Sequence, residues 1–89
     1  MTWTIKFTSS FAKELKRLDK PTRLRILKYF DDLQTIEDPR VRGKGLTGNL
    51  SGYWRYRIGD YRVVVELIDN QLVILAIDLG HRREIYKRY

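Results

Sequence analysis

The sequence predicts an α+β fold with two layers, in which two amino-terminal helices pack on a small antiparallel β-sheet. Apolar residues recur with helical spacing over residues 11–33, whereas residues 53–79 hold alternating or continuous runs of β-branched and aromatic residues. The length of 89 residues, 43% of them hydrophobic, suits a single domain over 1–89 with one modest core. The predicted order of elements is strand, helix, helix, strand, strand, strand.

The first two predicted elements are a short strand over residues 3–7, where polar and apolar residues alternate, and the helix that follows it. Ser9 or Ser10 is expected to cap this helix, because a serine hydroxyl can accept a hydrogen bond from a backbone N–H of the first turn. The apolar stripe of the helix consists of residues at positions i, i+4 and i+7, namely Phe11, Leu15 and Leu18. An apolar stripe of this kind must pack against another element, and we expect that element to be the sheet.

A second helix is predicted to begin near Pro21, since proline suits the first helical turn, and to end before Pro39, which cannot continue a helix. Its apolar stripe consists of Ile26, Leu27, Phe30 and Leu33. We expect the two helices to form a hairpin. The segment that follows, EDPRVRGKGLTGN at 37–49, is rich in glycine and charge and is predicted to be a loop.

Three strands are predicted after this loop, over residues 52–58, 61–68 and 71–79. Gly59-Asp60 fits a two-residue turn with glycine in its first central position. Asp69-Asn70 provides a second tight connection, since these residues tolerate left-handed backbone. The three strands therefore form an antiparallel meander, and the tail over 81–89 is expected to form one or two helical turns.

Basic residues outnumber acidic ones, with eighteen Lys and Arg against eleven Asp and Glu, a net charge of +7 and a pI near 9.9. This excess favours a polyanionic partner, although charge that only maintains solubility is the alternative. Cysteine is absent, which excludes disulfides, thiolate chemistry and cysteine-based metal sites. No nucleotide-binding motif or cluster of metal ligands occurs, so we expect no cofactor and no metal. Without an export signal or an apolar run near the roughly 20 residues that span a bilayer, no membrane contact and a cytoplasmic location are expected.

The predicted hairpin YWRYRIGDYR, residues 53–62, concentrates arginines on one surface. Because side chains alternate along a strand, Arg55 and Arg57 point away from the helices, and the two-residue turn places Arg57 directly opposite Arg62. Like charges in that arrangement destabilise a sheet by up to about 1 kcal/mol. A bound phosphate would relieve the repulsion, because guanidinium groups match phosphate oxygens in pairs. The alternative is an ordinary solvated surface on which Glu66 pairs with Arg55.

The carboxy-terminal residues are expected to lie beside Arg55, Arg57 and Arg62. If the last strand runs beside the strand 61–68, the chain leaves the sheet at the end where Arg62 lies, and His81, Arg82 and Tyr86 become candidate site residues. His81 is the only histidine, and imidazole titrates near neutral pH, which suits a proton donor or acceptor. The alternatives are a partly exposed surface histidine and a tyrosine used for packing.

Three segments of the chain resemble the RelE toxins of the RelE/ParE toxin–antitoxin superfamily. They are FAKELKRL at 11–18, KGLTGNLSGYWRYRIGDYRVVVELID at 44–69 and IDLGHRREIY at 77–86. The resemblance spans nearly the whole chain and implies a small sheet with two amino-terminal helices against it. It also implies an endoribonuclease that enters the ribosomal decoding site and cuts mRNA without a metal, through attack of the ribose 2′-hydroxyl on the neighbouring phosphorus.

The resemblance also implies roles for individual residues. The implied catalytic residues are Arg55, Arg57, Arg62, His81, Arg82 and Tyr86. Arg62 would hold the scissile phosphate, and the other arginines would stabilise charge, because an arginine is a poor general base. Tyr86 would orient the reacting groups, and His81 would act as an acid or a base. Residues expected to contact RNA outside this set are Arg42, Lys44 and Arg83.

The implied partners are a cognate RelB-like antitoxin, the small ribosomal subunit with its rRNA, the mRNA substrate, and operator DNA bound by a toxin–antitoxin hetero-oligomer. Two other functions are compatible with the fold. A ParE-like toxin would poison DNA gyrase without ribonuclease activity, and a non-catalytic module would bind RNA or act as a co-repressor. The arginine group followed by a late tyrosine favours the ribonuclease, since a gyrase inhibitor has no evident use for it.

Overall fold

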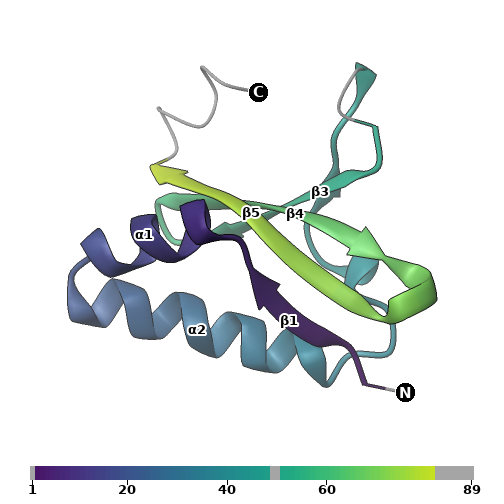
Figure 1. Cartoon of the computed structure of the whole chain (residues 1–89), viewed down its shortest axis with the longest axis horizontal. Coiled ribbons are helices and arrows are strands. Elements are labelled where there is room, and N and C mark those ends of the chain that lie inside the picture. The colour runs from purple at the N-terminus through teal and green to yellow at the C-terminus, as the bar shows by residue number, and fades with distance from the viewer. Residues whose placement is uncertain (1, 49–50, 82–89) are drawn as a thin grey trace.

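The computed structural model describes residues 2–48 and 51–81 of the chain. Its elements are β1 (Thr4–Phe7), α1 (Ser9–Arg17), α2 (Lys20–Gln34), the 3₁₀ turn η1 (Pro39–Val41), β2 (Lys44–Gly45), β3 (Tyr53–Ile58), β4 (Tyr61–Ile68), the 3₁₀ turn η3 (Asp69–Gln71) and β5 (Val73–His81). Both helices lie on one face of the sheet (Figure 1). The predicted two-layer α+β fold and its order of elements are confirmed, with the short strand β2 added.

The five strands form one sheet in the order β1-β5-β4-β3-β2. Strands β3, β4 and β5 form the predicted antiparallel meander, and the unpredicted strand β2 also pairs antiparallel with β3. Strand β1 pairs parallel with β5, starting with Thr4 opposite Val73, so the sheet is mixed and not purely antiparallel. Parallel strands need a crossover of a dozen or more residues, and both helices and the rest of the sheet lie between β1 and β5 in the chain.

The cap of α1 is Thr8, and the predicted caps Ser9 and Ser10 lie inside the helix. The Thr8 hydroxyl accepts a hydrogen bond from the Phe11 N–H at 3.1 Å. Thr8 has extended backbone, and its N–H donates to the Ala76 carbonyl of β5 at 3.1 Å, so the sheet still holds this residue. The point at which the chain leaves the sheet therefore decides which hydroxyl caps the helix.

The cap of α2 is Asp19, and Pro21 lies in the first turn as predicted. The Asp19 carboxylate accepts hydrogen bonds from the Thr22 hydroxyl at 2.8 Å and from the Thr22 N–H at 3.2 Å. These bonds lower the pKa of the Asp19 carboxyl below its ordinary value. The helix ends at Gln34, before the next proline, so its predicted extent is confirmed.

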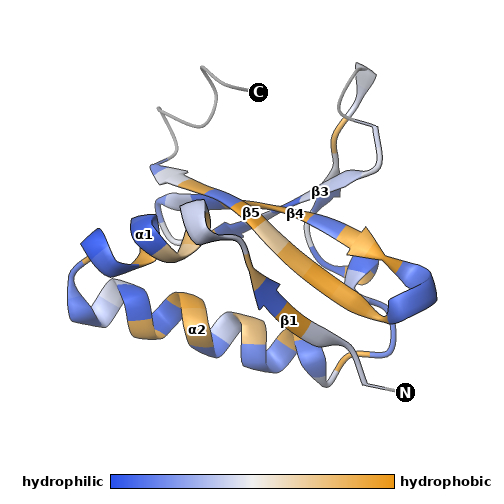
Figure 2. Cartoon of the chain, viewed as in Figure 1, coloured by the Kyte–Doolittle hydropathy of each residue, from blue (hydrophilic) through white to orange (hydrophobic). Residues whose placement is uncertain are grey.

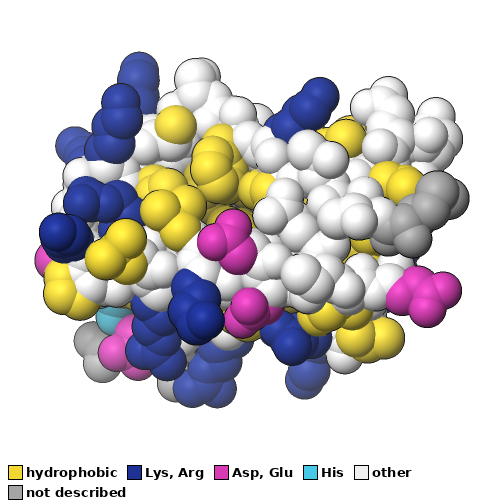
Figure 3. All heavy atoms as spheres, turned by 90° about the horizontal axis from the view of Figure 1, so that it is seen from below, with side chains coloured by type: hydrophobic (Ala, Val, Ile, Leu, Met, Phe, Trp, Pro, Cys, Tyr) yellow, Lys and Arg dark blue, Asp and Glu magenta, His cyan; other side chains and the backbone are white. Residues whose placement is uncertain are grey.

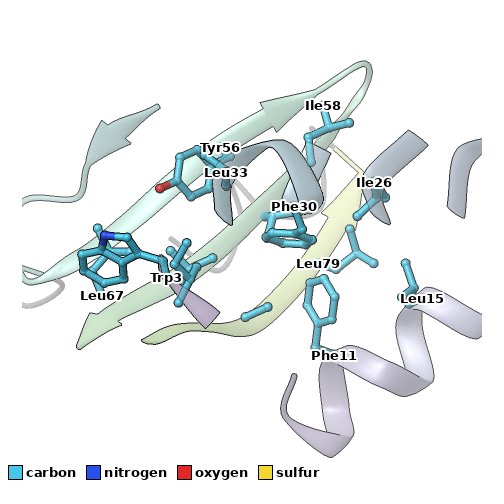
Figure 4. Packing of buried hydrophobic residues seen from close by; sticks show 14 residues of the cluster. Trp3, Phe11, Leu15, Ile26, Phe30, Leu33, Tyr56, Ile58, Leu67 and Leu79 are labelled. Atoms are coloured by element: carbon cyan, nitrogen blue, oxygen red, sulfur yellow. The ribbon is translucent and has the colours of Figure 1, made fainter. Parts of the chain in front are cut away.

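The core lies between the helices and the sheet (Figure 4). Phe11 of α1 and Phe30 of α2 meet there edge to face with ring centroids 5.9 Å apart, and β3 contributes the fully buried Tyr56. All residues of the two predicted stripes belong to the core or pack against it: Phe11, Leu15, Leu18, Ile26, Leu27, Phe30 and Leu33. Apolar residues dominate β5, while both helices alternate between apolar and hydrophilic residues (Figure 2).

The two hairpin connections differ. In the β3–β4 turn Gly59 has a φ of 60° and Asp60 has no positive φ, which is the predicted turn with glycine in the first central position. The predicted tight turn at residues 69–70 is wrong, because this connection is the 3₁₀ turn η3, and its left-handed residue is Leu72 with a φ of 52°. At its other end β5 includes His81, so the predicted helical tail does not begin at this residue. The rest of that predicted tail, residues 82–89, lies outside the described residues.

Candidate functional site

We call the sheet face opposite the helices the open face. The register pairs Arg57 with Arg62 and Arg55 with Val64, which confirms the pairing that the two-residue turn predicts. Tyr56 belongs to the core, so the alternating residues Arg55 and Arg57 project from the open face. Within the described part of the chain no helix covers this face (Figure 1).

Lys44 extends this cluster of cations onto β2. It lies opposite Arg55 in the β2–β3 pairing, and residues directly opposite across two strands share a face. The predicted loop position of Lys44 is therefore replaced by a position in a short strand beside the arginines. The four cations of the open face and its two carboxylates, Glu66 and Asp78, leave a net charge of +2.

Arg57 and Arg62 differ in exposure although they lie directly opposite each other. Arg57 is exposed, whereas only 4% of Arg62 is exposed. In a two-residue hairpin the residues next to the turn form the hydrogen-bonded pair, so these arginines form the next, non-hydrogen-bonded pair, whose Cα atoms are about 4.5 Å apart. Two like charges so close repel each other, and an anion between them would offset the repulsion.

The sheet holds Arg62 from several sides. Its Nη1 donates to the Tyr61 carbonyl at 3.4 Å, and the residue opposite it on β5 is Gly80, which adds no side chain. Among the described residues no buried side-chain nitrogen or oxygen lacks a hydrogen-bond partner, as a buried guanidinium requires. A charge fixed in such a low-dielectric position acts strongly on a phosphate that approaches it.

Asp78 is a residue of the open face that the sequence analysis does not identify. It lies opposite Val64, and its Oδ1 accepts a hydrogen bond from the Leu79 N–H at 2.9 Å. Strict alternation from the buried Ala76 would point Asp78 toward the core. A register shift between Val64 and Val65 marks a bulge in the β4–β5 pairing, and this bulge turns the carboxylate to the open face. No residue pattern in the sequence marks the bulge.

The alternative in which Glu66 pairs with Arg55 does not occur. Glu66 lies opposite Tyr53, and it forms no ion pair with any residue that the structure describes. The described ion pairs join Arg17 to Glu14, and Arg40 to Asp38 and Asp69. Glu66 therefore does not form the pair with Arg55 that the alternative of an ordinary solvated surface predicts.

His81 does not converge with the arginines of the open face. It lies opposite Tyr61, and the two rings meet edge to face with centroids 5.6 Å apart. Tyr61 packs against the core and pairs with Ile58, so both rings lie on the helix side of the sheet. His81 therefore lies at the predicted end of the sheet, but on the face opposite to that of the arginines. The other predicted site residues of the tail lie outside the described residues: Arg82, Arg83 and Tyr86.

Three aromatic side chains hold the loop that precedes β2. Each donates a hydrogen bond to a carbonyl of this loop: Trp3 to Glu37 at 3.0 Å, Tyr56 to Pro39 at 2.9 Å and Trp54 to Arg42 at 2.6 Å. Burial raises the pKa of Tyr56, so its hydroxyl stays protonated and remains a donor. The loop that the sequence predicts from glycine and charge is thus fixed to the sheet up to the start of β2.

Arg42 and Lys44 occupy different surfaces although the sequence groups them as RNA contacts. The Cζ atom of Arg42 lies 5.8 Å from the centroid of the Tyr29 ring of α2, a cation–π arrangement. Burial raises the pKa of the Tyr29 hydroxyl, against the opposing effect of Arg42. Lys44 joins the arginines of the open face, whereas Arg42 lies against α2.

The open face carries charged side chains from β2, β3, β4 and β5. The residues in the described ranges include no group of three His, Cys, Asp or Glu side chains that could share a metal ion. No helix described is both long enough and apolar enough to cross a bilayer.

The chain is similar to known toxins over nearly its whole length. A family model described as "ParE toxin of type II toxin-antitoxin system, parDE" matches residues 5–86. Toxin RelG of Mycobacterium tuberculosis is 28% identical over 89 residues, which cover 99% of this chain and 100% of that protein. The mRNA interferase toxin RelE of Escherichia coli is also 28% identical, over 97% of this chain and 92% of that protein.

Solved structures share the fold. The toxin–antitoxin complex RelBE2 of Mycobacterium tuberculosis contains a chain that superposes with a TM-score of 0.82 at 25% identity. The match covers 92% of this chain and 100% of that one. The two helices, the mixed sheet and the order of elements are therefore common to this chain and to that structure.

Proposed function

The chain belongs to the ParE toxin family of type II toxin–antitoxin systems, because the family model covers residues 5–86, and on this premise we propose that it is a ribosome-dependent endoribonuclease that cleaves mRNA. The observation that carries the proposal is the opposed pair Arg57 and Arg62 on the open face, with Arg55 and Lys44 beside it. The arrangement suits a phosphodiester, because guanidinium groups bind phosphate oxygens in pairs. The similar protein of Escherichia coli is named an mRNA interferase.

In the proposed reaction the ribose 2′-oxygen attacks the neighbouring phosphorus and the bond from phosphorus to the 5′-oxygen breaks. The proton of the 2′-hydroxyl passes to a base, an acid gives a proton to the departing 5′-oxygen, and a cyclic phosphate remains. Negative charge develops on the phosphorane oxygens, where fixed guanidinium groups stabilise it. Arg62 would hold the phosphate from within the sheet, while Arg57 and Arg55 would approach it from the β3 side.

Proton transfer requires other groups, because an arginine is a poor base. Asp78 is a carboxylate on the open face and becomes a candidate acceptor. His81 keeps its proposed role as acid or base on the condition that the RNA extends past the end of β4 to the edge where this imidazole lies. Arg82 and Tyr86 keep their proposed roles of assisting the departing oxygen and orienting the reacting groups.

A RelB-like antitoxin is the proposed protein partner, and it would silence the toxin by covering the open face. The similar chain of Mycobacterium tuberculosis was solved in a toxin–antitoxin complex. The other proposed partners are the rRNA of the small ribosomal subunit, the mRNA, and operator DNA bound by the toxin–antitoxin hetero-oligomer in the cytoplasm. The net charge of +7 favours each of these polyanions.

The test is to induce the protein in a translating extract and to map mRNA 5′ ends by primer extension. Cuts in phase with codons are expected, and Arg62→Ala is expected to lower cutting about 10²-fold or more, because the phosphate loses its charge stabilisation. Arg62 is buried, so the unfolding midpoint of each variant is measured in parallel, and Arg62→Lys serves as the variant that keeps the charge. Full cutting by a folded Arg62→Ala protein would reject the assignment.

The second candidate function is inhibition of DNA gyrase, and the description of the matching family model favours it. Induction of the protein in a translating extract also distinguishes gyrase inhibition from mRNA cleavage. Intact mRNA together with accumulated gyrase–DNA adducts would select the gyrase inhibitor. Intact mRNA without adducts, but with RNA retained by the protein, would select a non-catalytic RNA-binding module.

A further inference from the structure

A second cationic surface lies between α2 and the end of β3. It is a hollow of about 280 Å³, and its charged and aromatic lining consists of Arg25, Lys28, Tyr29, Asp32 and Arg57. Strand β2 pairs with β3 only as far as Arg55, so the edge of β3 is uncovered at this point. Figure 3 shows the molecule from the helix side, where Lys and Arg side chains gather along the lower border.

The charges of the hollow have no oppositely charged partners among the residues that the structure describes. The Arg57 side chain projects from the open face, so the side chains of the hollow itself are the cations Arg25 and Lys28 and the carboxylate Asp32, which leave a net charge of +1. In the ranges 2–48 and 51–81 none of Arg25, Lys28 and Arg57 forms an ion pair, and Asp32 forms none either. A concave surface that gathers cations in this way raises the local concentration of anions.

The side chain of Arg25 lies close to the turn between β3 and β4. A Cβ atom on Gly59 would lie 2.9 Å from the Arg25 Nη1, so the guanidinium occupies space that any other residue at this turn would fill. Gly59 thus serves the turn through its φ of 60° and also admits the guanidinium. A cation of α2 therefore lies beside the same hairpin that carries Arg57.

Arg57 connects the hollow to the open face. Its side chain projects from the open face opposite Arg62, and the residue also lines the hollow. The Arg55 carbonyl oxygen faces Gly43 on the β2 side, and main-chain groups two residues further along a strand point the same way. The main chain of Arg57 therefore faces the uncovered edge, beside the hollow.

We propose that the hollow binds one ribose-phosphate unit of an RNA strand whose neighbouring phosphate lies on the open face, an inference that rests on the proposed function. Arg25 and Lys28 hold the phosphate oxygens, and Arg57 stands where the strand crosses the edge of β3. RNA carries a phosphate on every nucleotide, so a single strand can engage both cationic surfaces at once. The volume of the hollow lies just below the range of about 300–1,000 Å³ typical of ligand pockets, which suits one nucleotide unit.

The remaining lining fits the ribose of RNA. The Asp32 carboxylate can accept a hydrogen bond from a ribose 2′-hydroxyl, the group by which proteins separate RNA from DNA. The Tyr29 ring offers an aromatic surface against which a sugar or a base packs. Both features fit a ribose-phosphate unit, and neither favours an aspartate or glutamate side chain.

The test measures the affinity of the full chain for a short fluorescein-labelled single-stranded RNA over a series of salt concentrations. The variant is Arg25→Gln/Lys28→Gln, and the matched control is Lys13→Gln/Lys16→Gln, two exposed lysines of α1 with the same spacing and the same loss of charge. In the variant the slope of log affinity against log salt is expected to fall by about 0.7, the value for one phosphate of a single strand. The control keeps the slope of the native protein.

A slope that is unchanged, or that falls equally in both double variants, overturns the proposal. Lys28→Gln alone repeats the test with a single exposed change, so a folding defect in the double variant does not decide the result. Asp32→Ala is expected to reduce the preference for RNA over DNA of the same sequence. If the Arg25→Gln/Lys28→Gln variant loses affinity for the cognate antitoxin and keeps the native RNA slope, the hollow is a protein site and the proposal is wrong.

The test separates this proposal from the proposed function because binding is measured without cleavage. If the native protein cuts mRNA on ribosomes but the Arg25→Gln/Lys28→Gln variant keeps the native salt dependence of RNA affinity, only the proposed RNA binding by the hollow is rejected. If the slope falls by the expected amount but no codon-phased cuts appear, only the nuclease activity is rejected.

Discussion

Tyr56 and Arg57 are neighbours on β3, but they belong to opposite faces of the sheet and differ in what they contribute. Tyr56 is fully buried, and its hydroxyl donates to the Pro39 carbonyl at 2.9 Å. Arg57 is exposed and lies opposite Arg62. Burial and hydrogen bonding of Tyr56 stabilise the fold, whereas the opposed charges disfavour it. The face covered by the helices is thus held by burial and hydrogen bonding, whereas the open face gathers the cations on which the proposed RNA binding rests.

The largest loss of stability is expected from substitutions on the sheet face that the helices cover. Tyr56→Ala removes a fully buried aromatic ring, and such changes destabilise a core by about 3–5 kcal/mol. Tyr56→Phe keeps the ring and removes only the hydrogen bond to the Pro39 carbonyl, so it should cost about 1–2 kcal/mol. Urea unfolding measures both. Equal losses in the two variants would show that the ring itself contributes little and would weaken the comparison.

The smallest effect is expected from a charge pair that belongs to neither face. The guanidinium of Arg40 donates to both carboxylate oxygens of Asp69, at 2.9 and 2.6 Å, and these hydrogen bonds lower the pKa of that carboxyl. A carboxyl with a lowered folded-state pKa contributes stability that is present above its unfolded-state pKa and is lost as the pH falls through the folded-state value. The unfolding midpoint of the native protein should therefore fall more steeply than that of Arg40→Gln from about pH 5 to pH 3. Parallel pH profiles would contradict the assignment.

The hairpin could be predicted from the sequence because local rules decide it. A glycine with positive φ sets a two-residue turn, the turn sets the register, and the register places Arg57 opposite Arg62. The stripes of the helices follow in the same way from their spacing. Tertiary contacts decide the rest: the sheet holds Thr8 and so moves the helix cap. The bulge beside Val64 turns Asp78 outward, although no residue of β5 signals it.

Two further features of the site depend on contacts that the sequence does not encode locally. His81 falls on the helix side because the pairing continues one residue beyond Gly80, opposite Tyr61. Arg25 and Lys28 resemble ordinary solvent-facing residues of α2, and only the approach of the hairpin turn makes them part of a hollow. Helical periodicity predicts which residues face the core, but it does not predict which outward residues meet another element.

The most direct test of the account is a paired measurement on Arg57→Gln, with RNA cleavage in a translating extract and urea unfolding on the same preparation. The account predicts that cleavage falls about 10²-fold or more, because a cation is lost from the phosphate site. It also predicts that the free energy of unfolding stays the same or rises by up to about 1 kcal/mol, because the repulsion from Arg62 disappears. Native cleavage by this variant, or loss of cleavage together with loss of stability, would contradict the claim that the open face exists to bind RNA.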